Sequence, residues 1–257
     1  MWASYGQLLR GYNKTGESVI IKHVELPPVP SSERAKVDYL RKKKSYQIEL
    51  DWYRSNYSIN GLRLTPLVDF YSDGPIYAIE DLSRHLYTPI SSIQPELLKI
   101  ILTALAAFHA YFLNVDNSYW DQGGYWSLDK RQFEWQSMSD EELKNQAHSI
   151  DQELNSAKHQ TIIHGDFKLA NILHKSYKEV AFVDFQYPGA GVGVKDLITL
   201  FASLPEEEHI NWQEELITFY FQELSKYENY TPELEKEWRD LYPLAWADYI
   251  RFLNGWK

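Results

Sequence analysis

The chain has 257 residues, of which 44% are hydrophobic, so it can form one large domain or two lobes around a sizeable core. Its formal net charge of −10 disfavours nucleic-acid binding, because phosphate backbones call for a basic surface. The absence of cysteine excludes disulfide bonds, thiolate metal sites and a cysteine nucleophile.

The charge is unevenly distributed along the chain. Residues 1–50 carry nine Lys and Arg against five Asp and Glu, while the rest of the chain is strongly acidic. No signal peptide is visible at the start, and no run approaches the roughly 18 apolar residues of a membrane span. We therefore expect a cytoplasmic protein that binds neither nucleic acid nor a membrane.

The first part of the chain reads as a small sheet with one helix. Strands are expected at residues 5–12 and 18–24, with Gly16 in the turn between them. After a proline-rich break, Ser31 or Ser32 can cap a helix that runs from about Glu33 to Ser55, with or without a break at the basic run 41–44. Two more strands are expected at residues 67–71 and 76–79, around a turn at residues 72–75.

The remainder reads as mostly helical. Residues 96–114 are apolar nearly all round, which predicts a buried helix that begins near Pro95. An aromatic, irregular segment is expected over residues 116–132. Further helices are expected at residues 140–157, 195–202, 206–226 and 232–256. A strand-rich first part and a helical remainder predict an α+β protein of two lobes, residues 1–80 and 81–257.

The most informative pattern lies between these helices. Two apolar runs, at residues 162–163 and 181–183, flank a polar loop, which predicts a strand, a loop and a strand. Asp166 lies five residues before Asn171, and Asp184 follows thirteen after it. Phosphoryl transfer needs such a set: a carboxylate that accepts the proton of an attacking hydroxyl, and an amide and a second carboxylate that hold Mg²⁺. The alternative is an ordinary loop with a capping Asp and a turn Asn.

This spacing matches the catalytic loop of protein kinases, with Gly165 in place of Arg and Gln186 in place of the last Gly of Asp-Phe-Gly. The sequence His164-Gly-Asp resembles the aminoglycoside phosphotransferase and choline kinase branch. Together with residues 189–197, it is most similar to the ecdysteroid kinase-like group and its bacterial cousins. The resemblance implies a bilobal protein-kinase-like fold, with a small β-rich N-lobe and a larger helical C-lobe. It also implies ATP- and Mg²⁺-dependent transfer of the γ-phosphate to a hydroxyl of a small acceptor, such as an amino alcohol, an aminoglycoside or a sterol.

The resemblance also implies a role for each site residue. Asp166 would be the catalytic base, with Lys168 acting at the γ-phosphate. Asn171 and Asp184 would hold Mg²⁺. In the N-lobe, Lys22 would hold the α- and β-phosphates and Glu49 would orient it. Glu80 and Leu82 would form the hinge between the lobes, where backbone groups bind the adenine edge. His109, His164 and Asp196 would have structural roles.

The phosphate-covering loop of the family is the weakest part of the resemblance. Only Ser4-Tyr5-Gly6 is available for it, and the family's first strand is missing or shortened to residues 1–3. This feature supports an alternative function, a weak or catalytically dead kinase-like nucleotide-binding module. A protein kinase is a third interpretation, weakened by Gly165 and by the lack of Ala-Pro-Glu after Asp184.

Aromatic residues make up 15% of the chain and suggest where an acceptor binds. Rings and carboxylates together would favour a cationic acceptor through cation–π contact and charge. The alternative is that the large rings only pack in the core. The candidates form two groups: Trp246, Asp248 and Tyr249 near the C-terminus, and Tyr119, Trp120, Tyr125 and Trp126 in the irregular segment.

Overall fold

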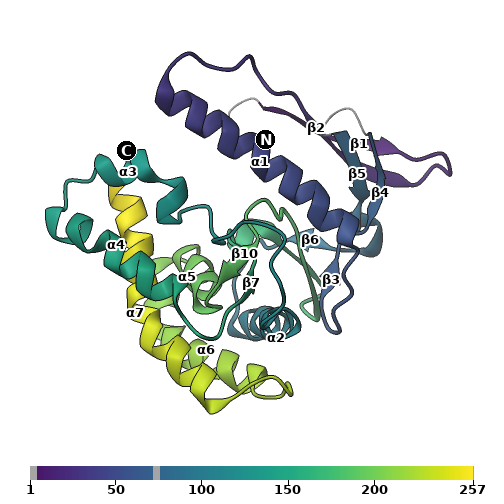
Figure 1. Cartoon of the computed structure of the whole chain (residues 1–257). Helices are drawn as coiled ribbons and strands as arrows, with labels where there is room; N and C mark the ends of the chain where they lie inside the picture. Colours follow the sequence, from purple (N-terminus) through teal and green to yellow (C-terminus); the bar gives the residue numbers. More distant parts are fainter. Residues whose placement is uncertain (1–4, 72–75, 257) are drawn as a thin grey trace.

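The structure, a computed structural model, describes residues 5–71 and 76–256, and for residues 206–211 it describes the backbone alone. The turn predicted at residues 72–75 and the shortened strand at residues 1–3 lie outside the described residues. A β-rich N-terminal region with one long helix lies against a larger helical part (Figure 1). The predicted α+β class is confirmed.

The N-terminal sheet has four antiparallel strands in the order β1-β2-β5-β4. They are β1 (Gly6–Tyr12), β2 (Ser18–Val24), β4 (Leu67–Phe70) and β5 (Ile76–Glu80). Strand β2 is rich in β-branched residues, which suit a half-buried pleated surface. Its central position, between β1 and β5, buries Lys22 opposite Tyr77.

Helix α1 (Glu33–Ser55) is continuous through the basic run, so no break occurs at residues 41–44. Ser32 caps it by accepting a hydrogen bond from the Ala35 N–H, and Asn56 ends it in a left-handed conformation. Only the C-terminal half is largely buried, including Glu49. The N-terminal half extends beyond the sheet toward α3 (Figure 1).

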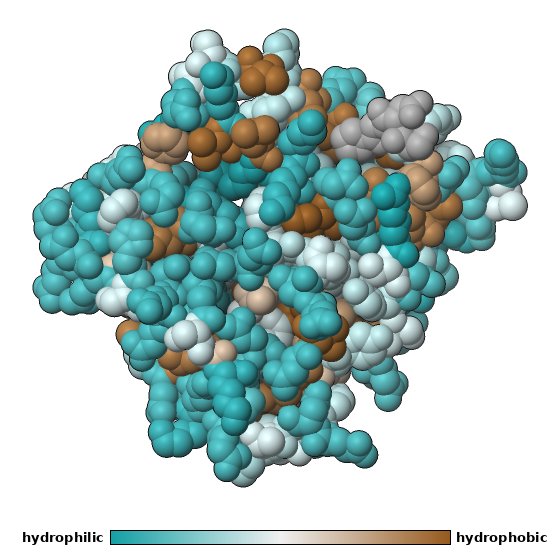
Figure 2. Space-filling view, in the orientation of Figure 1, coloured by the Kyte–Doolittle hydropathy of each residue, from teal (hydrophilic) through white to brown (hydrophobic). Residues whose placement is uncertain are grey.

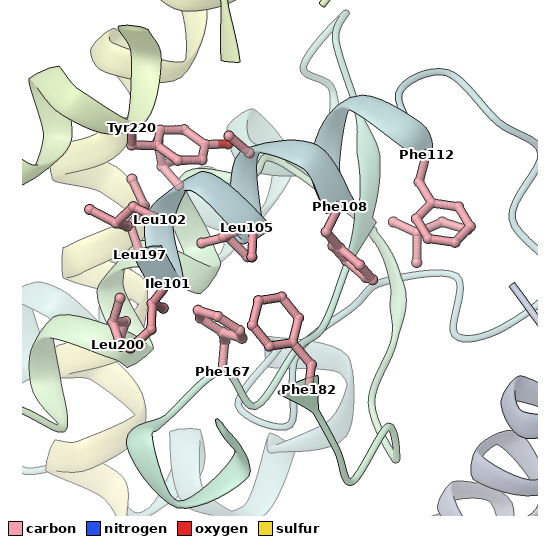
Figure 3. Close-up of a cluster of buried hydrophobic side chains, with 14 of the residues drawn as sticks. Ile101, Leu102, Leu105, Phe108, Phe112, Phe167, Phe182, Leu197, Leu200 and Tyr220 are labelled. Atoms are coloured by element: carbon pink, nitrogen blue, oxygen red, sulfur yellow. The ribbon is translucent and has the colours of Figure 1, made fainter. Parts of the chain in front are cut away.

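The helical part is built around α2 (Pro95–Tyr111), whose apolar residues are buried as the sequence predicted. In Figure 3, Leu105 and Phe108 of α2 point toward Phe167 and Phe182 from the segments that carry the polar loop. Each fully buried side chain of this size contributes about 1.5–3 kcal/mol, so the core holds the loop firmly. The other helices are α3 (Gln132–Gln136), α4 (Glu141–Asn155), α5 (Val194–Ala202), α6 (Glu206–Leu224) and α7 (Pro232–Gly255).

Short strands and 3₁₀ turns frame the polar loop. One antiparallel pair joins β7 (Thr161–Ile163) to β10 (Gly189–Gly191). A second sheet has the order β3-β9-β8-β6. Its strands are β3 (Arg63–Leu64), β6 (Thr88–Pro89), β8 (Ile172–Lys175) and β9 (Glu179–Phe182). The 3₁₀ turns are η2 (Leu82–His85), η3 (Leu128–Lys130) and η4 (Leu169–Asn171).

The expected helices and the four strands of the first sheet are confirmed, and their ends differ from the prediction by a few residues at most. The largest difference is at the C-terminal end of α2. No helix among the described residues is long and apolar enough to cross a membrane. The face seen in Figure 2 is largely hydrophilic, in keeping with the net charge of −10.

Candidate active site

Lys22 lies between two carboxylates that come from distant parts of the chain. Its Nζ donates to Oε2 of Glu49 at 2.5 Å and to Oδ1 of Asp184 at 2.8 Å. Burial lowers the pKa of Lys22, but the charges of Asp184 and Glu49 outweigh it and hold that pKa above its ordinary value. The lysine therefore stays charged and joins the sheet, α1 and the segment after β9.

Glu49 reaches Lys22 from the buried face of α1. Burial raises the pKa of Glu49 to about 7; Lys22 opposes this shift and Asp184 adds to it. A carboxylate this deeply buried needs its cation, because an unpaired buried charge is strongly destabilising. The pairing predicted for these two residues is present in the geometry.

Asp184 follows β9 in a left-handed backbone conformation, with φ of 66°. Its backbone N–H donates to Oη of Tyr53, and Gln186 Nε2 donates to Oδ1 of Asp184 at 2.7 Å. Burial alone would raise the pKa of Asp184, but Lys22 and Gln186 outweigh it, so the pKa is far below its ordinary value. The side chain is 36% exposed, which leaves a charged oxygen surface for a ligand.

The polar loop brings three of the predicted site residues together. Lys168 Nζ donates to Oδ2 of Asp166 at 2.9 Å. Asn171 Nδ2 donates to the carbonyl oxygen of Asp166 at 2.8 Å and to its Oδ2 at 3.1 Å. Burial raises the pKa of Asp166, while Lys168 opposes the shift. A raised pKa makes the carboxylate a better proton acceptor.

Buried hydrogen bonds hold this loop from below. Asp196 of α5 accepts from the backbone N–H of His164 at 2.7 Å and from that of Gly165 at 3.0 Å. His109 of α2 donates to the same carboxylate through Nε2 at 3.2 Å, and the Tyr220 hydroxyl donates to His109 Nδ1. The structural roles expected for Asp196 and His109 are confirmed by these contacts.

His164 is also a structural residue, as expected. Its Nε2 donates to the carbonyl oxygen of Val183 at 3.0 Å, which links the polar loop to the residue before Asp184. The Asp166 N–H donates to its Nδ1. Both ring nitrogens thus position the two acids instead of facing a substrate.

Gly165 shows why this loop contains glycine where protein kinases have arginine. Its φ is +78°, and a Cβ added there would lie 2.1 Å from the Tyr187 carbonyl oxygen. The Gly165 carbonyl accepts from the Tyr125 N–H, and the Tyr187 carbonyl accepts from the Gly124 N–H. The loop is therefore packed directly against the aromatic segment, with no room for a side chain.

The expected hinge lies at the end of β5. Glu80 forms an ion pair with Arg63 and a hydrogen bond with the His85 ring. Leu82 begins η2, and its carbonyl accepts from the Tyr87 N–H. A hinge role in adenine recognition stays a prediction for both Glu80 and Leu82.

The two aromatic groups turn out to be mainly packed. Trp126 is fully buried, Trp120 is nearly so, and Asp248 pairs with Arg251 at 2.8 Å. Tyr125 is half-buried and stays beside the polar loop. Core packing, the alternative interpretation, therefore accounts for Trp120, Trp126 and Asp248.

Sequence reasoning missed the side chains that support Asp184. Gln186 bonds Asp184, and Ser45 of α1 donates to Gln186 Oε1 at 3.3 Å. The sequence signal for this contact was Gln186, which stands where protein kinases have the last Gly of Asp-Phe-Gly. It also missed that Lys130 and Arg131 of the aromatic segment are buried, because nothing in their local sequence distinguishes them from surface residues.

The residues fit a Mg²⁺ ion held jointly with phosphate oxygens. Magnesium prefers oxygen ligands and usually keeps several from water or phosphate. Asp184 has an accessible carboxylate, and Asn171 uses its amide nitrogen on Asp166, which leaves its amide oxygen available. In the described part of the chain, no group of three His, Asp or Glu side chains forms an all-protein metal site.

Comparisons with known proteins bear on the family resemblance and on the fold. Residues 122–231 match the model of the ecdysteroid kinase-like family. No curated protein matches the chain. The resemblance to the superfamily of aminoglycoside phosphotransferases and choline kinases is confirmed by this match and by the structures below.

Solved small-molecule kinases share the fold at low identity. An amicoumacin kinase in complex with AMP-PNP and Ca²⁺ has a TM-score of 0.61 and 14% identity, over 99% of this chain and 82% of that one. A choline kinase from Streptococcus pneumoniae has a TM-score of 0.56 and 13% identity, over 98% and 82%. A Plasmodium vivax ethanolamine kinase has a TM-score of 0.56 and 12% identity, over 97% and 75%. The chain therefore has the fold of protein-kinase-like phosphotransferases.

Proposed function

We propose that this protein is an ATP- and Mg²⁺-dependent kinase that transfers the γ-phosphate of ATP to a hydroxyl group of a small molecule. One observation carries the proposal. Residues that are up to 162 positions apart converge so that Lys22 pairs with Glu49 and Asp184. Asp166 and Asn171 form a second hydrogen-bonded set on the loop before Asp184. Each charged group that phosphoryl transfer requires is thus present.

The chemistry follows from the position of each group. The acceptor oxygen attacks the γ-phosphorus, its proton passes to the Asp166 carboxylate, and the bond to the bridging oxygen breaks so that ADP leaves. Lys22 holds the α- and β-phosphates. Lys168, whose Nζ lies 2.9 Å from Oδ2 of Asp166, is placed to offset the negative charge that develops on the γ-phosphate oxygens.

A bound Mg²⁺ ion would neutralise phosphate charge in this site. We assign its protein ligands to Asp184 and Asn171. The strong preference of Asp184 for its charged form suits this role. We further propose that the nucleotide lies between the sheet and the helical part, with the chain dividing into lobes at residues 80 and 81 and with Glu80 to Leu82 at the adenine.

The test is acceptor-dependent ADP release from Mg·ATP, measured with pooled small hydroxyl compounds. Asp166→Ala should lower turnover by about 10²- to 10⁴-fold, because the general base is lost. A matched variant, Asp116→Ala, removes an exposed carboxylate away from the loop and should keep full activity. Equal turnover by Asp166→Ala would remove the base assignment. Absence of turnover in every pool would favour the alternative of an inactive nucleotide-binding module.

A further inference from the structure

The aromatic rings next to the polar loop already hold cations of the chain itself. Lys44 Nζ lies 4.3 Å and Lys130 Nζ 4.6 Å from the centre of the Trp120 ring. Arg131 lies 5.8 Å from the centre of the Tyr125 ring. These are cation–π distances, so the Trp120 and Tyr125 rings already interact with cations of the chain.

This basic wall borders the groups assigned to catalysis. We define it as Lys44, Lys130, Arg131 and the Trp120 ring. Trp120 Nε1 donates to the backbone carbonyl of Gln186 at 2.9 Å, two residues after Asp184. Ser45, the neighbour of Lys44, bonds the Gln186 side chain. An acceptor that approaches Asp166 from this side therefore meets the wall.

Two carboxylates next to the wall are already paired with its cations. Glu134 pairs with Arg131 at 3.3 Å, and Asp129 pairs with Lys130 at 3.3 Å. The Asp248 carboxylate forms ion pairs with both Arg251, at 2.8 Å, and Lys195, at 3.9 Å. Two buried cations thus share one carboxylate, and these acids are not placed to bind a cationic acceptor.

Helix α1, which carries Lys44, adds further positive charge to the wall. Its basic run comprises residues 41–44, and Arg41 Nη1 donates to the Lys130 carbonyl at 2.9 Å. Lys44 is exposed, so its ammonium group can contact a ligand as well as the ring. The pKa of Lys130 is lowered to about 8, mainly by burial and further by Lys195 and Lys44, while Asp129 opposes the shift. A neighbouring anion would relieve this repulsion.

We propose that the acceptor carries an anionic group, a carboxylate or a phosphate, which Lys44 holds against the basic wall while its hydroxyl faces Asp166. The inference rests on the proposed kinase function. It narrows the acceptor to hydroxy acids, sugar acids or phosphorylated alcohols. It departs from the cationic acceptor that aromatic content alone suggested, because Trp120, Tyr125, Trp126 and Asp248 already contact cations of the chain.

Matched acceptor pools test the proposal. Mg·ATP is supplied with amino alcohols, with neutral polyols, with hydroxy acids and sugar acids, or with sugar phosphates, and ADP release and phosphorylated product are both measured. Turnover is expected only in the two anionic pools, and which of them is used separates carboxylate from phosphate recognition. Rising salt should raise the KM for the acceptor, because screening weakens the attraction.

Charge reversal at Lys44 provides the second readout. Lys44→Glu should raise the KM for the anionic acceptor by roughly tenfold or more, with kcat changed by less than about twofold, because a binding contact is lost and not the chemistry. Lys36→Glu reverses an exposed lysine of the same helix outside the wall and should leave both constants unchanged.

The outcomes separate the two proposals. Turnover of amino alcohols with a KM that falls in Lys44→Glu would overturn the anionic acceptor and leave the kinase standing. Turnover of a neutral polyol with a KM that Lys44→Glu leaves unchanged would also overturn the anionic acceptor and leave the kinase standing. Absence of turnover in all four pools would overturn the kinase function, and the acceptor inference with it.

Discussion

At the scale of single residues, Gly165 lets two chain segments approach more closely than any side chain would permit. Its positive φ and the contact that a Cβ would make with the Tyr187 carbonyl are separate constraints. Gly16 has φ of +80°, but a Cβ added there would meet no atom within 4 Å, so it shares only the first constraint. Comparing substitutions at the two glycines therefore separates the energetic cost of backbone strain from that of steric exclusion.

Gly165→Ala should lower the free energy of unfolding by about 3 kcal/mol or more, because the loop or the segment of Tyr187 must move. Gly16→Ala should cost about 1 kcal/mol, the ordinary penalty of a left-handed non-glycine residue. Urea unfolding of the two variants and the parent chain measures both values. Equal losses would show that the Tyr187 segment yields easily and that close packing does not fix the loop.

At the scale of elements, the site depends on two helices that carry none of the proposed catalytic residues. Helix α5 supplies Asp196, and α2 supplies His109. The Asp196 carboxylate accepts from two backbone N–H groups and one ring, so both oxygens are used. An amide at this position would turn one acceptor into a donor and leave a buried N–H without its partner.

Asp196→Asn should therefore lower the free energy of unfolding by about 1–3 kcal/mol, the cost of an unsatisfied buried group. Turnover should fall by roughly tenfold to a hundredfold, because the loop that positions Asp166 shifts. The control is Asp240→Asn, at an exposed i,i+4 pair with Lys236, which should change stability by less than about 0.5 kcal/mol. Parent-like turnover in Asp196→Asn would contradict the bracing role.

The elements also show how far sequence reasoning reaches. Helix α2 could be predicted because its apolar residues leave no polar face. The two-residue strands β3 and β6 could not, because they exist only through pairing with β9 and β8, far along the chain. Local patterns carry no information about such partners.

The site divides in the same way. The spacing of Asp166, Asn171 and Asp184 is local and was readable from the sequence. The burial of Lys130 and Arg131 depends on how α1 and the aromatic segment meet, so their role in the basic wall emerged only from the structure.

At the scale of the whole molecule, the polar contacts that tie the N-terminal region to the helical part include Lys22 with Asp184, Ser45 with Gln186, and the Arg41 guanidinium with the Lys130 carbonyl. All three lie along the proposed acceptor and nucleotide site. The two parts should therefore unfold together, and a ligand bound between them should stabilise both.

A single thermal transition is expected, and Mg·ATP at about a hundred times its Kd should stabilise the chain by about 2.7 kcal/mol. For a chain of this size, that corresponds to an increase in Tm of roughly 5–10 °C.

Removing Mg²⁺ with EDTA should abolish most of the increase. Asp184→Asn should do the same, because it removes both a proposed metal ligand and a partner of Lys22, whereas Asp69→Asn, on the exposed face of β4, should keep the full increase. Differential scanning calorimetry gives the Tm and the number of transitions together. Two separate transitions of which only one responds to Mg·ATP would mean that the three contacts do not couple the parts, and a full increase in Asp184→Asn would remove its metal role.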